Sequence, residues 1–412
     1  MRKGSLLMGI LVLSLGAYSQ ELGLEEILKR VETNNPEIRV KELDVKIKEK
    51  GKKKAFRNLI LPPVTIESEN DWETAKNEGF GFEKIEATIP LFQGGKMMNT
   101  YKKSKSELEL SKAEKILAVY SWQEAGVDAY FSTLNYKKQR EITDLTIAAL
   151  QKQRNRLSGL YKENKMIAKS EVLKVEADLE NNRALNFENA QKERASKEVL
   201  MQLLGYDLDR QVTLEEFNTV NYLNSLGDIK KVKNPKDTTL GKKESLMVDL
   251  AEYDLKITKA DLYPVVYIKP SHRFKEENLD TNKYETVNEG RVELGITYTF
   301  AWGATLDSVD QSEYKLDQAR IMYDNNIQGI ELDMRNKLGE IESLAGQSEA
   351  QKKRLELLRE NLKIDNLRYD NELVTTFDYL NSVNQLRTAE EDYYKLQRTL
   401  VLAVIEYENL YK

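Results

Sequence analysis

Two long stretches without proline dominate the chain, one from about Met97 to Asn164 and the other from about Thr305 to Asn371. In both, apolar residues recur every seven positions between surfaces crowded with Lys, Glu, Gln and Arg, as in Tyr120, Val127, Leu134 and in Ile327, Met334, Ile341. This spacing predicts coiled-coil helices. At 1.5 Å per residue each helix would be about 100 Å long, which is more than a compact domain of this size can enclose. We therefore expect helices that bridge a distance.

The chain is also an internal duplication. Three landmarks recur at offsets of 208, 201 and 207 residues: Phe92-Gln93-Gly94-Gly95 with Phe300-Ala301-Trp302-Gly303, Pro63 with Pro264, and Ser170 with Phe377. Each copy is predicted to hold a helix, a β-hairpin, a long helix and a return helix. Besides the two long helices, we expect an N-terminal helix over about 24–58 and return helices over about 170–204 and 376–411. The predicted order is a signal peptide at 1–19, a first repeat at 20–204, an irregular mixed linker at 205–245 and a second repeat at 246–412.

The N-terminus predicts export. Arg2 and Lys3 precede an apolar run from Leu6 to Leu15, and Ala17-Tyr18-Ser19 fits the small-x-small site of signal peptidase. The alternative, a membrane anchor, is disfavoured because a helix over this run spans only about 15 Å of a hydrocarbon core about 30 Å thick. No later stretch is apolar for long enough to form a membrane helix, so a membrane crossing would have to use β-strands.

Alternating segments of about nine to eleven residues form the predicted hairpins: 63–72 with 85–91, and 264–274 with 292–300. Each has one apolar and one polar face, a pattern typical of outer-membrane strands, although a solvated hairpin on a soluble domain can also show it. Aromatic residues gather at the strand ends, where an interfacial girdle would lie: Trp72, Phe80, Phe82, Phe92, Phe300 and Trp302. Four strands cannot close a barrel, so several chains must contribute.

The amino-acid composition excludes most kinds of catalytic and metal-binding site. The chain has no Cys and one His, which excludes disulfides, thiol nucleophiles, iron-sulfur centres and multi-histidine metal sites. The formal net charge of −5 gives no sign of a nucleic-acid partner. We expect no enzyme, no cofactor and no metal site.

The chain resembles the TolC family of outer-membrane efflux proteins over essentially its whole mature length. The resemblance rests on the order and spacing of Asn35-Pro36, Pro62-Pro63, the Pro90-Leu91-Phe92 to Gly95 junction, Leu203-Leu204-Gly205, and two tip segments, 167–173 and 374–380. It implies a mainly α protein with a small β part. Three chains would form a helical barrel across the periplasm and a transmembrane β-barrel with about four strands per chain, in the outer membrane of a Gram-negative-type bacterium. A periplasmic adaptor protein and an inner-membrane transporter would complete the export machine.

The resemblance also implies a closed entrance at the periplasmic tip. Tyr369 matches a family Tyr that links neighbouring helices, Asp378 matches the first Asp of a pore ring, and Glu171 matches the first-repeat acid to which the family's Tyr and Arg connect. Two positions depart from the pattern, because Val374 stands at the family's Arg and Asn381 at its second ring Asp. The Arg link cannot form with these residues, so we expect a looser gate.

Two interpretations of Asp378 remain open on the residues alone. Three copies around an axis would make a carboxylate ring that favours cations. Thr375-x-x-Asp378 is also similar to a capping box at a helix start, and both roles can coexist because capping leaves one carboxylate oxygen free. Tyr369 is expected to act as a packing aromatic rather than as a gate hydrogen-bond donor.

The sequence favours an outer-membrane channel of a multi-component efflux or type I secretion machine, a passive conduit gated at its periplasmic tip. The expected partners are two further copies of the chain, the adaptor, the transporter and outer-membrane lipid. The alternative is a soluble periplasmic coiled-coil adaptor or structural spacer, whose hairpins would be solvated.

Overall fold

The computed structural model describes residues 20–68, 83–164, 167–225, 233–278, 283–371 and 373–412. The predicted signal peptide lies outside them. The chain divides into two compact units. Unit 1 comprises Met1–Asn35, Gln123–Gly227 and Leu344–Val401, and unit 2 comprises Pro36–Trp122, Asp228–Ser343 and Leu402–Lys412.

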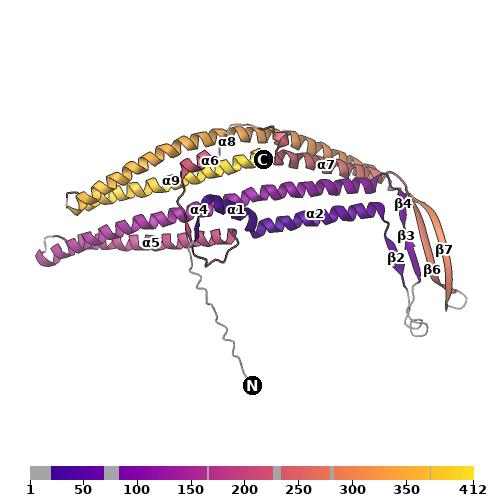
Figure 1. Cartoon of the computed structure of the whole chain (residues 1–412), viewed down its shortest axis with the longest axis horizontal. Coiled ribbons are helices and arrows are strands. Elements are labelled where there is room, and N and C mark those ends of the chain that lie inside the picture. Colours follow the sequence, from indigo (N-terminus) through magenta and orange to yellow (C-terminus); the bar gives the residue numbers. More distant parts are fainter. Residues whose placement is uncertain (1–19, 69–82, 165–166, 226–232, 279–282, 372) are drawn as a thin grey trace, which may run out of the picture. The chain divides into compact units, whose positions relative to one another are not determined.

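Helices make up most of the described chain (Figure 1). They are α1 (Leu24–Asn34), α2 (Pro36–Ile60), α4 (Lys96–Asn164), α5 (Lys169–Leu203), α6 (Thr219–Ser225), α7 (Thr239–Ala260), α8 (Ala304–Asp370) and α9 (Thr376–Tyr411). The two long helices predicted from the sequence are confirmed, because α4 has 69 residues and α8 has 67, each rising about 100 Å. In the part of the chain that is described, no helix combines the length and the apolar character that a membrane span requires.

The N-terminal helix, expected to be continuous, is divided at Asn35. That residue has an extended backbone, with φ −62° and ψ 126°, because the ring of Pro36 disfavours the helical region for the residue before it. The Asn35 side chain is buried and donates a hydrogen bond to the Leu203 carbonyl at 3.2 Å. The break therefore attaches the end of α1 to the end of α5 within unit 1.

The segment between the repeats contains short regular elements. Strand β5 (Val212–Leu214) pairs in parallel with β1 (Gln20–Leu22), and α6 follows it. After a 3-10 turn at Pro235–Asp237, helix α7 begins at Thr239, inside the range expected to be a linker. It begins there because the hydroxyl of Thr238 accepts a hydrogen bond from the Gly241 N–H at 3.0 Å, which caps the helix.

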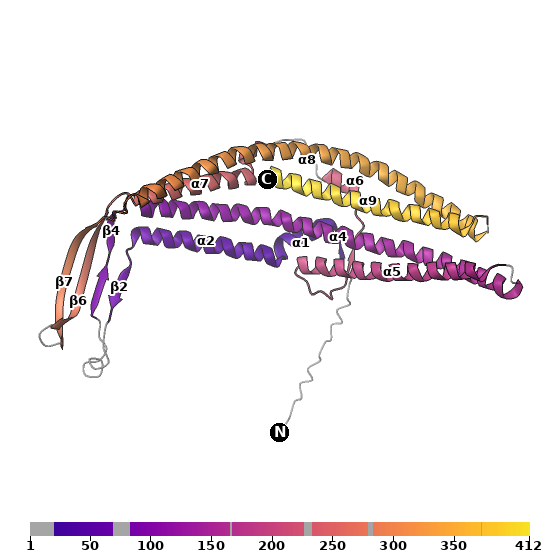
Figure 2. The ribbon, with the colours of Figure 1, turned by 180° about the vertical axis from the view of Figure 1, so that it is seen from behind.

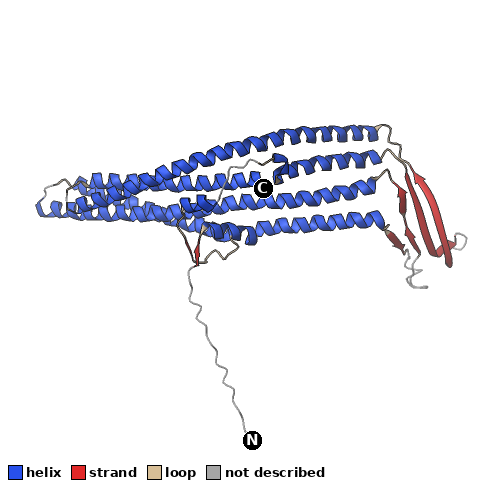
Figure 3. Ribbon diagram, turned by 45° about the horizontal axis from the view of Figure 1, so that its top comes forward, coloured by secondary structure: helices blue, strands red, loops and turns tan. Residues whose placement is uncertain are grey.

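A twisted sheet in unit 2 joins the helices in pairs (Figure 3). It consists of β2 (Val64–Glu67), β3 (Lys84–Ala87), β4 (Ile89–Phe92), β6 (Val265–Asn278) and β7 (Lys283–Thr297). Strands β3 and β4 pair antiparallel with successive parts of β6, so together they occupy one strand position, and the order is β2, β3/β4, β6, β7. The expected four strand positions per chain are confirmed. Strands β2 and β7 form the two edges.

The β6–β7 hairpin extends further than its alternating pattern indicated. Pairing continues to Asn278 and Lys283, although apolar residues stop alternating beyond Pro270 and Val292. Most residues in this outer part of the sequence are polar, so hydrophobic alternation carries little signal there, while backbone pairing persists.

The two faces of the sheet differ in chemistry. Exposed apolar side chains cover one face, among them Val64, Ile66, Val292, Leu294 and Ile296, each more than half exposed. The other face carries ion pairs across three strand positions: Lys84 with Glu67 at 3.1 Å and with Glu86 at 2.9 Å, and Lys269 with Glu86 at 3.0 Å. The predicted alternation thus places apolar and charged groups on opposite sides.

Left-handed residues form the two corners between strand and long helix. Gly94 and Gly95 have φ of 57° and 79°, and Trp302 and Gly303 have φ of 48° and 93°. A Cβ on Gly94 would lie 2.9 Å from the backbone of Ala260, whereas a Cβ on Gly303 would meet nothing within 4 Å. The first corner is closely packed against the end of α7, and the second is open.

Candidate functional site

The turn from α8 to α9 holds Asp378. Thr375 donates to Asp378 Oδ2 from its hydroxyl at 2.6 Å and from its N–H at 3.3 Å, and the Asp378 N–H donates to Thr375 Oγ1 at 3.1 Å. These reciprocal bonds satisfy N–H groups that the start of α9 leaves without helical partners. The predicted capping bonds are therefore present. Asp378 is exposed, and both accepted bonds use Oδ2, so its second oxygen faces away from the cap.

Tyr369, the penultimate residue of α8, contacts two other helices, α9 and α4. Its ring stacks on Tyr379 of α9, with centroids 4.8 Å apart and an interplanar angle of 12°. Its hydroxyl donates to the Ala149 carbonyl of α4 at 3.4 Å and accepts from Thr376 Oγ1 at 3.3 Å. Tyr369 thus packs, as expected, and its hydroxyl also forms hydrogen bonds within the chain.

A cation from the first repeat lies at the same place. Lys152 on α4 pairs with Asp370 at 2.9 Å, and its Nζ lies 5.2 Å from the centroid of the Tyr369 ring. Burial raises the pKa of the Tyr379 hydroxyl, and the charge of Asp370 raises it further. Sequence reasoning missed Lys152, because no local spacing connects α4 with the end of α8.

The other predicted residues lie apart from this contact. Glu171, in the first turn of α5, is exposed and pairs with Lys174 at 3.0 Å; within the described chain it is not bonded to Tyr369 or Asp378. Asn381 is exposed one turn after Asp378, and Val374 is half-buried in the turn before α9. A single chain therefore brings Tyr369 and Asp378 onto one hairpin and leaves Glu171 on another.

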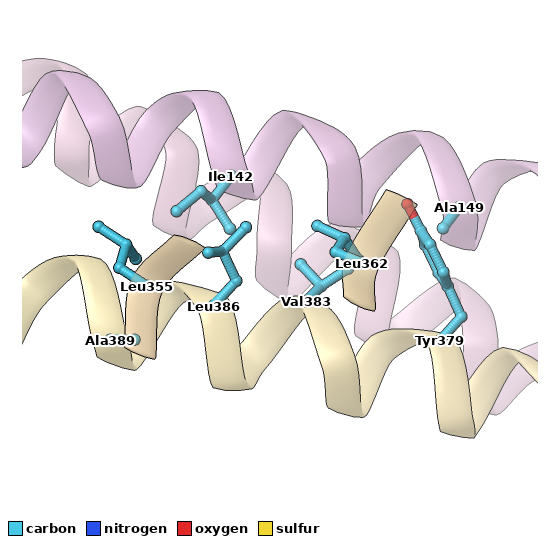
Figure 4. Close-up of a cluster of buried hydrophobic side chains, with 8 residues drawn as sticks. All are labelled: Ile142, Ala149, Leu355, Leu362, Tyr379, Val383, Leu386 and Ala389. Atoms are coloured by element: carbon cyan, nitrogen blue, oxygen red, sulfur yellow. The ribbon is translucent and has the colours of Figure 1, made fainter. Parts of the chain in front are cut away.

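An apolar cluster supports the α8–α9 hairpin (Figure 4). It joins three helices through Ile142 and Ala149 of α4, Leu355 and Leu362 of α8, and Tyr379, Val383, Leu386 and Ala389 of α9. The corresponding cluster of the α4–α5 hairpin has three buried members, Leu150, Val175 and Leu179. Among the described residues, no group of three or more His, Cys, Asp or Glu side chains could hold a metal ion.

Among known protein families, a match is found for the second of the two repeats. Residues 242–410, which correspond to the second repeat, match the protein family described as outer membrane efflux protein. The second repeat therefore carries the sequence signature of this family. This match confirms the predicted resemblance to TolC-type channels and the expectation of a transport protein rather than an enzyme. Among curated proteins, none matches the chain in sequence.

Solved structures show that the fold of the family extends over the whole chain. The Campylobacter jejuni CmeC outer membrane channel is 15% identical, with 94% of this chain and 85% of that chain covered and a TM-score of 0.73. The CusC structure is 14% identical, with 96% and 95% covered and a TM-score of 0.71. The outer membrane protein VceC from Vibrio cholerae is 15% identical, with 94% and 96% covered and a TM-score of 0.65. The expected fold class is confirmed.

Proposed function

We propose that this protein is the outer-membrane conduit of a multi-component efflux or type I secretion machine. The two-faced sheet carries the proposal. Its exposed apolar face, with Val292 76% exposed, suits contact with lipid, and its charged face suits a water-filled lumen. The helices attached to its strands are long enough to reach far into a periplasm. Export through such a conduit is passive, and a partner pump supplies the energy.

Three copies of the chain would supply about twelve strand positions for one closed barrel. Closure would remove the unpaired edges that β2 and β7 present in a single chain. A periplasmic adaptor and an inner-membrane transporter would complete the machine. Contact with the adaptor would shift the packing of the tip helices from a closed to an open arrangement.

The exposed turns would form the periplasmic entrance. Three Asp378 carboxylates would ring the axis while their Oδ2 atoms cap α9, so the ring would use the remaining oxygen. Val374 and Asn381 stand where the family has an Arg and a second Asp. Closure of the entrance would therefore depend on the packing of Tyr369 and Tyr379 and on weaker hydrogen bonds. The resting entrance would accordingly open more readily than one with both links.

Planar-bilayer recording of the purified protein tests the conduit and the ring together. The wild type is expected to give a small, cation-selective conductance, and Asp378→Asn to reduce the selectivity while its amide oxygen retains the capping bonds. Asp178→Asn, which removes the same charge from an exposed position on α5, serves as the matched control. Loss of selectivity in both variants, or in neither, would contradict the ring, and absence of any conductance would contradict the channel.

Restoring the Arg of the TolC-family link at position 374 tests whether its absence makes the gate looser. Val374→Arg is expected to lower the open probability by adding a charged donor at the entrance, whereas Val374→Leu should leave it unchanged. An equal response to both substitutions would show that bulk rather than the link controls opening. Recovery of the mature protein in the soluble periplasmic fraction would support the adaptor or spacer instead.

A further inference from the structure

Helices α2 and α8 are the outer helices of unit 2. Ion pairs connect the four helices in the order α2, α4, α7, α8: Lys48 with Glu107 at 3.0 Å, Lys103 with Asp254 at 2.5 Å, and Lys259 with Glu313 at 2.7 Å. Both side views show the same order (Figures 1 and 2). Helices α4 and α7 therefore have a helix on each side, whereas α2 and α8 each have one side without a helical neighbour.

The open face of α2 is basic and apolar. Counted in heptads from the buried Ile38, the positions away from α4 hold six exposed cations: Arg39, Lys46, Lys50, Lys53, Lys54 and Arg57. The apolar side chains between them, Val40, Leu43 and Ile47, are about half exposed or more. No acidic residue occurs at these positions. Such a stripe is the pattern of a coiled-coil face that lacks its partner.

The open face of α8 is acidic and apolar. Counted from Val309 and Leu316, which are buried against Leu255 of α7, the opposite positions hold four exposed acids: Asp307, Asp310, Asp317 and Asp324. Exposed apolar side chains accompany them, namely Tyr314, Ile321 and Leu332. No basic residue occurs at these positions. The two open faces thus match in apolar character and have opposite charge.

The charges also match in their distance from the sheet. Arg57 lies three residues before the end of α2, and Asp307 lies three residues after the start of α8. Lys54 and Asp310 are each six residues from those helix ends. Within the described chain, none of these four side chains forms an ion pair. They are therefore available to a partner that runs antiparallel at the same level.

The chain already uses this charge pattern between its own repeats. Lys96 and Lys103 of α4 pair with Asp261 and Asp254 of α7, so cations of the first repeat meet acids of the second. The open edges continue into the sheet, because β2 follows α2 and β7 precedes α8. An anionic lipid surface would fit the cations of α2, but it would repel α8. The acidic face of α8 and the exposed apolar side chains, which on α2 extend as far as Val40, about 30 Å from the strands, favour a second copy of the chain.

We propose that the basic face of α2 docks onto the acidic face of α8 in a second copy, so that opposite charge on the two repeats sets the order of subunits around the axis. The inference rests on the proposed conduit, since repetition of this contact closes the ring. Like faces repel, so two α2 edges or two α8 edges cannot pair. Assembly is consequently head-to-tail and sensitive to salt, because the exposed charges are screened.

Charge exchange between the edges tests the proposal. The variants are Lys54→Glu/Arg57→Glu on α2, Asp307→Lys/Asp310→Lys on α8, and the combination of all four. Light scattering in detergent at 0.15 M salt should show trimer formation weakened about tenfold by either pair of reversals and restored by the combination. Lys102→Glu/Lys105→Glu, exposed on the inner helix α4, is the matched control and should assemble normally. A combined variant that assembles no better than its parents would overturn the proposal.

Cross-linking tests the position of the contact. Because the chain has no Cys, Arg57→Cys/Asp307→Cys introduces one defined pair, and a bifunctional thiol reagent should give covalent trimers. Dimers alone, or no cross-linking in a protein that is trimeric, would overturn the register. If the α2 reversal instead abolishes binding to vesicles containing phosphatidylglycerol while trimers persist, α2 is a lipid-binding face and the proposal is wrong.

The wild-type conductance separates this inference from the proposed function. Normal conductance with no effect of charge exchange would overturn the contact and leave the conduit intact. A wild-type protein that neither conducts nor forms trimers would overturn both.

Discussion

The two hairpins at the ends of the long helices arise from the same duplicated motif, yet they are stabilised differently. Helix α9 begins with the reciprocal bonds of Thr375 and Asp378, and its apolar cluster has eight buried members, four of them on α9 itself. Helix α5 begins after Ala168, which supplies no side-chain capping bond, and its cluster has three buried members. Local opening requires less free energy where fewer groups are buried or capped. The α4–α5 hairpin should therefore open first.

Core truncation should expose this difference most strongly. Leu355→Ala leaves a cavity in the larger cluster and is expected to lower the free energy of unfolding by about 2–5 kcal/mol. Leu179→Ala in the smaller cluster should fall at or below the lower end of that range, because its few neighbours can close the space. Urea unfolding followed by circular dichroism measures both. An equal loss would contradict the comparison.

The second largest difference in stability between the two hairpins should come from their ion pairs. Glu390 on α9 is 1% exposed, and its Oε1 accepts from Arg359 Nε at 3.0 Å and from Nη2 at 2.7 Å. Glu390→Gln should lower the free energy of unfolding by about 1–3 kcal/mol, because the neutral amide of Gln forms a weaker buried hydrogen bond with Arg359. The side chains of Arg154 and Glu176, which join α4 to α5, are 40% and 38% exposed, so Glu176→Gln should lower the free energy of unfolding by only about 0–1 kcal/mol. The two variants can be ranked by their urea midpoints.

Removing the cap of α9 and adding a cap to α5 should each reduce the difference in stability between the two hairpins. Thr375→Ala removes the α9 cap and is expected to cost about 0.5–2 kcal/mol, whereas Ala168→Ser adds a capping hydroxyl to α5 and should gain about 0.5–1 kcal/mol. Hydrogen exchange of the first-turn amides reports each effect locally. Unchanged exchange at the start of α5 in Ala168→Ser would show that something other than the missing cap limits this hairpin.

The smallest effect is a pH dependence that differs between the repeats in unit 2. Burial raises the pKa of Asp249 on α7, so ionisation of this group opposes folding above its folded pKa and the penalty disappears as pH falls. A hydrogen bond from Lys115 lowers the pKa of Glu42 on α2, so its contribution is present at neutral pH and is lost in acid. Asp249→Asn should raise Tm slightly at pH 7 and Glu42→Gln should lower it. Both differences should shrink as pH falls below about 4, because the two carboxyl groups become protonated in the folded and the unfolded state.

The extent of the long helices could be predicted from the sequence because it depends on residues that lie close together in the chain. The absence of proline between Lys96 and Asn164, together with the heptads, indicated α4 almost to the residue. The Thr375-x-x-Asp378 spacing likewise indicated the cap, whose partners are three residues apart. The division of α1 from α2 was missed, although Pro36 marked it.

Contacts between repeats could not be predicted in this way. The position of Lys152 beside Tyr369 depends on how α4 pairs with α8, and no periodicity within either helix specifies that register. The roles assigned to Glu171, Val374 and Asn381 stay predictions, because they concern neighbours that one chain does not contain. The extent of the hairpin was missed for a different reason, since most residues of its outer part are polar and form no regular alternating pattern.

The two glycine corners show how copies of one ancestral unit can drift into different degrees of mutational tolerance. At Gly94 the backbone of Ala260 occupies the space that any larger residue would need, so every substitution there must displace a neighbouring helix. At Gly303 the surroundings are open, so a side chain would meet no neighbour there, and the strain of its φ of 93° alone would oppose a substitution. Substitution at the first corner therefore meets both a steric clash and backbone strain, whereas substitution at the second meets backbone strain alone.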